Sequence, residues 1–135
     1  MKVALRSIAT VRNSRKQPVD DSWEVIISEI HLEDDIPSEA FDGISGFSHF
    51  EIIYLLNQVN HDDIVFSGRP RGNPIFPSLG IYAQRKKDRP NTIGLCNVEL
   101  LEHKDRMIRV KYLDAIDGTP VLDIKPVYRE FLPKS

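Results

Sequence analysis

The amino-acid sequence predicts a mainly β protein, folded as a closed or nearly closed antiparallel barrel. Short runs of alternating apolar and polar residues recur along the chain, as half-buried strands require. No window of a dozen residues has a convincing helical period. Turn-forming residues separate the runs at Asp42-Gly43, Ser67-Gly68, Gly72-Asn73-Pro74 and Asp117-Gly118. Many short strands joined by such turns are typical of a barrel, because closure leaves no strand edge exposed.

The first elements along the chain are expected to be two strands and one helical turn. Residues 3–11 alternate and predict a half-buried strand, with an apolar parity made of Val3, Leu5, Ala9 and Val11. Residues 23–32 are rich in Val and Ile and predict a second strand. Residues 36–43 predict a single helical turn, which Pro37 opens and Gly43 closes.

The rest of the chain supplies most of the predicted strands. Residues 50–56 contain the longest apolar run and suit a strand that is covered on both faces. Residues 106–113 alternate cleanly between an apolar side and a basic side. The other strands are predicted over residues 79–84, 93–101 and 120–124.

Length and composition predict one soluble domain that spans residues 1–135. The chain is 41% hydrophobic and 28% charged, which is the profile of a globular protein. Its single cysteine excludes an internal disulfide and fits a reducing, cytoplasmic compartment. No apolar run approaches the ~20 residues that a membrane-spanning helix needs, and no signal peptide is visible. These observations exclude secreted mini-proteins, membrane spans and fibres.

Charge is segregated along the chain although the net charge is only −2. Residues 1–19 carry five basic residues and no acid, and residues 20–42 carry nine acids and no base. Residues 69–91 carry six basic residues against one acid, Asp88. If the basic segments meet in the fold, this pattern places a positive face beside a negative one; solvated charged loops are the alternative.

Common catalytic motifs are missing from the sequence. Cys96 shares its parity with Gly94, Val98 and Leu100, so it is expected to be a buried small hydrophobe rather than a nucleophile. The four histidines lack the pairing of a zinc site, and no metal is expected. No Walker loop, Gly-x-Gly-x-x-Gly or Gly-x-Ser-x-Gly is present.

Two segments stand out as candidates for binding chemistry. Residues 80–95 form a cationic connection between two predicted strands, and their Arg85 and Arg89 are suited to carboxylate or phosphate. Residues 113–126 begin with an acidic turn in which Asp114 and Asp117 flank two apolar residues. Spacing alone leaves open an ordinary basic loop and an ordinary hairpin turn.

These two segments resemble the TsaA-like family, whose characterised members are the TrmO-type tRNA methyltransferases. The family pattern Arg-Pro-Asn-x-Ile-Gly-Leu stands here at residues 89–95, and Asp-Gly-Thr-Pro followed by Asp-Ile-Lys-Pro stands within residues 117–126. The resemblance extends from Leu5 to about Phe131, nearly the whole chain. It implies a short, single-domain β-barrel subunit that forms a homodimer and binds S-adenosyl-L-methionine near the dimer interface. The implied reaction is N6-methylation of N6-threonylcarbamoyladenosine at position 37, in the anticodon loop of tRNA.

The resemblance also implies the site residues. The family's cofactor-contacting positions fall on Arg15, Lys16, Gln17, Asn57, Gln58, Arg85, Leu95, Asp114, Ala115, Ile116 and Asp117. On this basis Arg85 is expected to pair with the cofactor's carboxylate, Leu95 to frame its adenine and Asp117 to accept a proton as the catalytic residue. Phosphates that flank the modified base would be held by Lys86, Lys87 and Arg89.

The chain also departs from the family pattern. Asn57-Gln58 replaces a family His-Lys pair, and Thr92 replaces a proline. Three alternatives therefore stand beside the tRNA enzyme: a methyltransferase of the same fold with another acceptor, a non-enzymatic RNA-binding module, and a partner-binding regulator.

Overall fold

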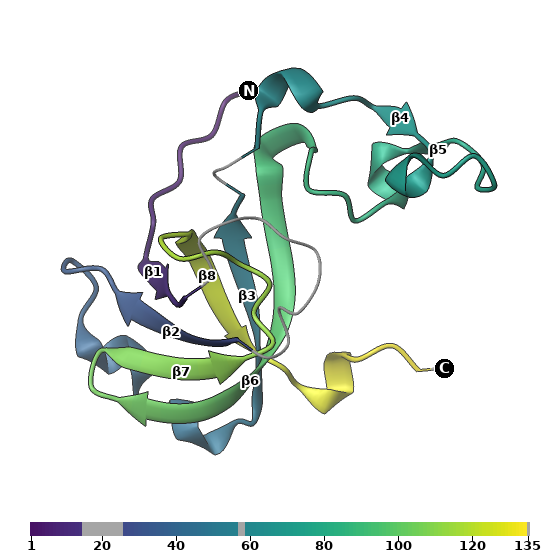
Figure 1. Cartoon of the computed structure of the whole chain (residues 1–135). Coiled ribbons are helices and arrows are strands. Elements are labelled where there is room, and N and C mark those ends of the chain that lie inside the picture. Colours follow the sequence, from purple (N-terminus) through teal and green to yellow (C-terminus); the bar gives the residue numbers. More distant parts are fainter. Residues whose placement is uncertain (15–25, 57–58, 135) are drawn as a thin grey trace.

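A closed antiparallel barrel is the main body of the computed structural model, which describes residues 1–14, 26–56 and 59–134 (Figure 1). The strands follow one another around the barrel in the order β1-β2-β7-β6-β3-β8. Their bounds are β1 Ala9–Arg12, β2 Ile27–Leu32, β3 His49–Leu55, β6 Ile93–Lys104, β7 Met107–Lys111 and β8 Pro120–Pro126. The sequence-based prediction of a closed antiparallel barrel is confirmed.

A second, two-stranded sheet lies outside the barrel. It pairs β4 (Ser67–Gly68) with β5 (Leu79–Gly80), and Figure 1 shows it to one side of the barrel. Both strands belong to the described part of the β3–β6 connection, residues 59–92. Several large apolar side chains of this connection are exposed to solvent, as are its basic residues Arg71, Lys86 and Lys87.

The helical elements of the described residues are 3-10 turns of three or four residues. They are η2 Ser38–Phe41, η3 Ile44–Gly46, η4 His61–Asp63, η5 Pro70–Gly72, η6 Ile81–Ala83, η7 Pro90–Thr92 and η8 Arg129–Phe131. The turn predicted over residues 36–43 is confirmed by η2, and Gly43 adopts a φ of 78° that favours glycine. Throughout the described ranges, none of the helices has the length and hydropathy needed to cross a bilayer.

β6 is the longest strand of the barrel and joins two different neighbours. Its first half pairs with β3, from Leu55 opposite Ile93 to His49 opposite Glu99. Its second half pairs with β7, which ends at Lys111, opposite Glu99. Directly after β7 the Tyr112 carbonyl accepts from the Cys96 thiol of β6 at 3.0 Å, and further on Gly118 and Thr119 are bonded to Val11 of β1.

The core fills the barrel interior with aliphatic side chains from every strand of the closed sheet. The largest fully buried ones are Val11, Ile30, Ile52, Val98, Ile108, Val110, Leu113 and Val121. Burial of each such side chain contributes roughly 1.5–3 kcal/mol, so the alternating strands hold the barrel together chiefly through this interior.

Three of the strand predictions need correction. Residues 3–8 are not part of a strand: Val3 and Leu5 are exposed, and β1 begins only at Ala9. The strand predicted over residues 79–84 stops at Gly80, where the chain turns into η6. β3 is not fully covered on both faces, since the Phe50, Ile52 and Tyr54 parity is buried whereas the other is partly exposed.

Candidate functional site

The acidic turn, residues 113–119, lies between β7 and β8 in the chain. Leu113, Ala115 and Ile116 are buried and anchor the turn in the core, whereas the Asp114 side chain faces solvent. Within the turn the Thr119 hydroxyl donates to the Ile116 carbonyl over 2.7 Å. Gly118 has a φ of 88° and donates its amide to the Val11 carbonyl at 2.7 Å. The buried apolar residues thus hold the turn, in which Asp114 is exposed.

Asn13, directly after β1, ties the acidic turn to two strands. Its backbone amide donates to Asp117 Oδ1 at 2.9 Å. Its side-chain amide donates to the Ser28 hydroxyl and to the Ala115 carbonyl, both at 2.9 Å. Because Ser28 is fully buried, this contact also satisfies a hydroxyl that water cannot reach. Asp117 is therefore held in place by β1, with one carboxylate oxygen engaged by a backbone amide.

The basic loop, residues 84–91, precedes β6, and its two arginines have different surroundings. The exposed Arg85 donates through its guanidinium to the Leu95 carbonyl at 3.2 Å. Arg89 instead donates to carbonyls of its own loop, at 2.8 Å to Gln84 and 3.0 Å to Lys86. Arg85 can therefore reach a ligand from the edge of β6, whereas Arg89 fixes the shape of the loop.

Backbone strain marks the end of the basic loop. Asn91 and Thr92 both have positive φ, 66° and 50°. Positive φ is unusual for a β-branched residue, and Thr92 is also buried. Its carbonyl accepts from the Leu56 amide at 2.7 Å, so β3 helps to hold the strained conformation. Such strain is common where a loop must present a site in one fixed shape.

Cys96 lies between the acidic turn and the basic loop. Its thiol donates to the Tyr112 carbonyl at 3.0 Å, which fastens β6 to the start of the acidic turn. Burial raises the pKa of the thiol, and the Asp114 charge raises this pKa further, whereas the Asp114 backbone amide and the Arg85 charge lower it. The structure brings the basic loop and the start of the acidic turn to the same stretch of β6, since Arg85 donates to the Leu95 carbonyl and Cys96 donates to the Tyr112 carbonyl. Cys96 is partly buried, not fully buried as predicted.

The remaining predicted site residues divide into four groups. Leu95 lies on β6 with its side chain exposed, next to the Arg85 contact. Lys86 and Lys87 are exposed at the tip of the basic loop. Ala115 and Ile116 are buried, so only their backbone can face a ligand. Five predicted cofactor-contacting residues lie outside the described residues: Arg15, Lys16, Gln17, Asn57 and Gln58.

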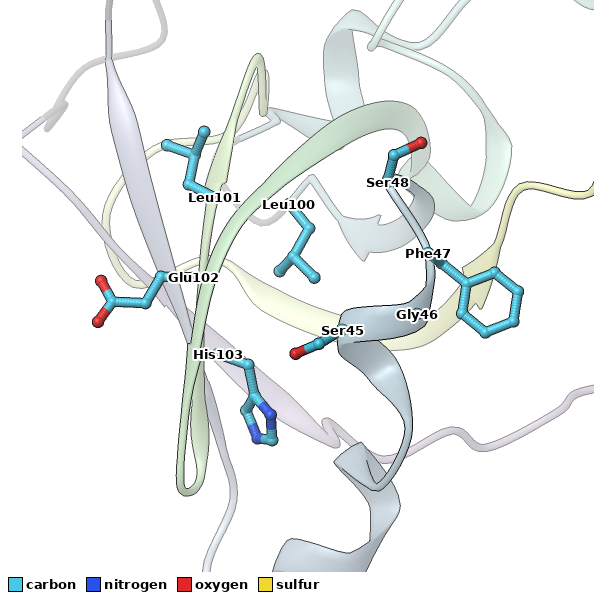
Figure 2. A pocket seen from close by; sticks show the side chains of 8 residues that line it. All are labelled: Ser45, Gly46, Phe47, Ser48, Leu100, Leu101, Glu102 and His103. Atoms are coloured by element: carbon cyan, nitrogen blue, oxygen red, sulfur yellow. The ribbon is translucent and has the colours of Figure 1, made fainter.

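A cavity of about 420 Å³ lies at the far end of β6, away from these charges (Figure 2). It is lined by Ser45, Gly46, Phe47, Ser48, Leu100, Leu101, Glu102 and His103. Figure 2 shows the Ser45 hydroxyl and the His103 ring on the same side, with the Phe47 ring turned away. The predicted site residues do not contribute to this cavity.

Metal-binding groups of three or more His, Cys, Asp or Glu side chains do not occur among the described residues. The His61-Asp62-Asp63 segment forms η4, and Asn60 caps it by accepting from the Asp62 amide at 3.0 Å. This is the ordinary geometry of an Asx-capped turn.

The fold and the site define a class: a closed β-barrel with a basic loop and an acidic turn at one stretch of β6. A family model of the tRNA-methyltransferase O N-terminal domain matches residues 9–131. The chain belongs to this family, the TrmO-type S-adenosylmethionine-dependent methyltransferases.

Individual relatives agree with this assignment. The chain is 37% identical over 134 residues to a probable S-adenosyl-L-methionine-binding protein of Methanothermobacter thermautotrophicus, covering 96% of this chain and 93% of that protein. It is 38% identical over 102 residues to the tRNA (adenine(37)-N6)-methyltransferase of Escherichia coli, covering 71% of this chain but 43% of the enzyme. A crystal structure of TrmO from Pseudomonas aeruginosa has the same fold, with a TM-score of 0.77, 24% identity, and coverage of 97% and 58%. Among the matched proteins, therefore, some are about as long as this chain and others are much longer.

Two residues of the site are not among the sequence-predicted ones. Asn13 holds Asp117 and Ala115, and Tyr54 donates its hydroxyl to the Asp114 carbonyl at 2.9 Å. Nothing in the sequence marks Asn13 as a site residue, because a polar residue directly after a strand is common. For Tyr54 the signal would have been the pairing of β3 with β6, which places Tyr54 opposite Gly94.

Proposed function

We propose that this protein is an S-adenosyl-L-methionine-dependent tRNA methyltransferase that methylates N6 of N6-threonylcarbamoyladenosine at position 37. The observation that carries the proposal is the contact of Arg85 with the Leu95 carbonyl, next to Cys96, whose thiol donates to the Tyr112 carbonyl at the start of the acidic turn. The names of the relatives, S-adenosyl-L-methionine-binding proteins and a tRNA (adenine(37)-N6)-methyltransferase, support it.

The charges of the site fit the amino-acid end of this cofactor, which carries a carboxylate and an ammonium. Arg85 presents a planar guanidinium for the carboxylate, and the exposed Asp114 presents an acceptor for the ammonium. Exposed Leu95 and Ile93 on β6 offer apolar surface for the adenine ring. When bound, the cofactor supplies a methyl group on a positively charged sulfur, and this chemistry needs no metal.

The acceptor nitrogen needs a base because it carries a proton and is attached to a carbonyl group. We propose Asp117 for this role. The hydrogen bond from the Asn13 amide to Asp117 Oδ1 holds the carboxylate at a fixed place beside the proposed cofactor site. A positioned proton acceptor contributes typically 10²–10⁴-fold to the rate.

Recognition of tRNA is assigned to the basic loop, because the bases of an anticodon loop can be splayed out while the protein holds the flanking phosphates. Lys86 and Lys87 are exposed and supply these contacts. Arg89 contributes by fixing the loop through its carbonyl contacts. Affinity for tRNA is then expected to fall steeply with salt. The reaction would take place in the cytoplasm.

A homodimer is part of the proposal. The β3–β6 connection exposes large apolar side chains, with Phe66 70%, Ile75 80% and Tyr82 78% exposed. Clustered exposed apolar residues mark interaction surfaces. A second copy that covers this connection would also screen the proposed cofactor site from water. Light scattering during gel filtration should give twice the mass of the chain, and a monomer mass would contradict this part of the proposal.

The central experiment is transfer of labelled methyl from S-adenosyl-L-methionine to tRNA that carries the threonylcarbamoyl group. We expect the purified protein to label this tRNA and Arg85→Ala to lose most of the labelling. Arg129→Ala is the matched control, because Arg129 is an exposed arginine in η8, remote in sequence from the basic loop. Labelling of small metabolites without labelling of tRNA would select the methyltransferase with another acceptor. Salt-sensitive RNA binding that is indifferent to cofactor would select the non-enzymatic module.

A further inference from the structure

The ring of Tyr54 passes directly over Gly94 inside the barrel. Tyr54 on β3 and Gly94 on β6 are paired in the sheet, so their side-chain positions are on the same face. A Cβ atom at residue 94 would lie 2.6 Å from Cε2 and 2.7 Å from Cζ of the Tyr54 ring, closer than real contacts allow. Glycine at position 94 therefore leaves the space through which the ring reaches beyond β6.

The Tyr54 hydroxyl ends at the acidic turn. It donates to the Asp114 carbonyl over 2.9 Å, and only 4% of Tyr54 is exposed. The thiol of Cys96, two residues after Gly94, donates to the Tyr112 carbonyl. Residues on both sides of the buried Leu113 are therefore tied to β3 or β6, which limits where the Asp114 side chain can lie relative to the edge of β6.

We propose that Tyr54 is a positioning residue for the acidic turn. Its hydroxyl sets the place of Asp114 relative to Arg85, and thereby the affinity of the site for the zwitterionic end of the cofactor; this inference rests on the proposed function. Gly94 is required because it lets the ring cross. The Tyr54 hydroxyl does not touch the reacting atoms in this scheme, so its effect should appear in cofactor binding and not in the methyl-transfer step.

The first test compares cofactor binding of the wild type and Tyr54→Phe by isothermal titration calorimetry with S-adenosyl-L-methionine. Phenylalanine keeps the buried ring and removes the hydrogen bond, so we expect binding to weaken about 3–10-fold, the usual worth of one buried neutral hydrogen bond. Tyr128→Phe removes an exposed hydroxyl at the carboxyl end of the chain and should leave binding unchanged. Equal affinity of Tyr54→Phe and wild type would overturn the inference.

The second test uses a kinetic separation. We expect Tyr54→Phe to raise the cofactor KM about 3–10-fold while kcat at saturating cofactor changes less than about two-fold. Gly94→Ala, which pushes the ring aside, should weaken cofactor binding in the wild-type background and much less in the Tyr54→Phe background. Independent, additive effects of the two substitutions on cofactor affinity would contradict a shared route through the hydroxyl.

A third measurement separates this inference from the proposed function. Hydrogen exchange of the Thr119 amide, which is bonded to the Ile116 carbonyl within the turn, can be followed without any cofactor. We expect exchange to be several-fold faster in Tyr54→Phe than in wild type or Tyr128→Phe. If wild type fails to bind S-adenosyl-L-methionine but this exchange still accelerates, the proposed function is wrong and the positioning of the turn stands. Unchanged exchange would overturn the positioning itself.

Discussion

Replacement of Asn13 by alanine should destabilise the protein through the loss of two side-chain hydrogen bonds. These bonds reach the Ser28 hydroxyl and the Ala115 carbonyl, both at 2.9 Å. Each is worth about 1 kcal/mol, and the fully buried Ser28 hydroxyl loses a partner that water cannot replace. Asn13 itself is half-buried, so water can enter part of the space that its side chain leaves. We therefore expect the free energy of unfolding to fall by about 2–3 kcal/mol, which lowers Tm by about 6–12 °C for a chain of this length.

Urea denaturation followed by circular dichroism measures this change. Asn97→Ala, an exposed asparagine on β6, is the matched control and should stay within about 0.5 kcal/mol of wild type. In a Ser28→Ala background, where no buried hydroxyl is left without a partner, Asn13→Ala should cost about 1 kcal/mol less. A loss below about 0.5 kcal/mol for Asn13→Ala in the wild-type background would refute the clamp that we derive from these bonds.

Three further changes test other parts of the structure. The hydrogen bond with His31, and then the hydrogen bond with Arg109, lower the pKa of Glu29 below 4.5. The ionised carboxylate of Glu29 is thus favoured in the folded state. Its contribution to stability is present above pH 4.5 and is lost as the pH falls through the folded pKa. Glu29→Gln should therefore flatten an acid-unfolding curve in this range, and an unchanged curve would contradict this prediction. Gly118→Ala should lower stability in urea by about 1–2 kcal/mol because of its positive φ, whereas Gly46→Ala, with no positive φ and open space around its Cβ, should not. Cys96 should react with iodoacetamide at pH 8 more slowly than a free cysteine, because burial raises the pKa of its thiol; equal rates would contradict this prediction.

Local sequence patterns predicted those strands whose apolar side chains are buried in the barrel. The alternation of residues 106–113 predicts β7 because one parity of this strand is buried in the barrel. The same kind of alternation in residues 3–7 is misleading, because Val3 and Leu5 are exposed and the strand begins only at Ala9. The alternation of the paired residues and that of the unpaired residues look the same in the sequence. Only the long-range pairing of β1 with β2 and β8 shows where the first strand begins.

The candidate site was predictable where charge carried the signal. Arg85 and Asp114 could be singled out, because segregated charges and family motifs mark them in the sequence. The contacts that place them could not. Asn13 and Asp117 are 104 positions apart, and Tyr54 and Asp114 are 60 apart. Such partners follow from strand register, which the sequence of one strand does not specify. The difference between Arg85 and Arg89 likewise depends on which carbonyls lie within reach. Assignment of residues 1–135 to a single domain stays a prediction.

The short first strand closes the barrel by joining β2 on one side and β8 on the other. During synthesis β1 leaves the ribosome long before β8, the last strand of the barrel. The nascent chain therefore has to keep both edges of an unfinished sheet, and its apolar interior, from associating with other chains until more than a hundred further residues have been made. Closure depends on contacts between distant parts of the chain, so this protein is expected to fold slowly for its size and to benefit from chaperones.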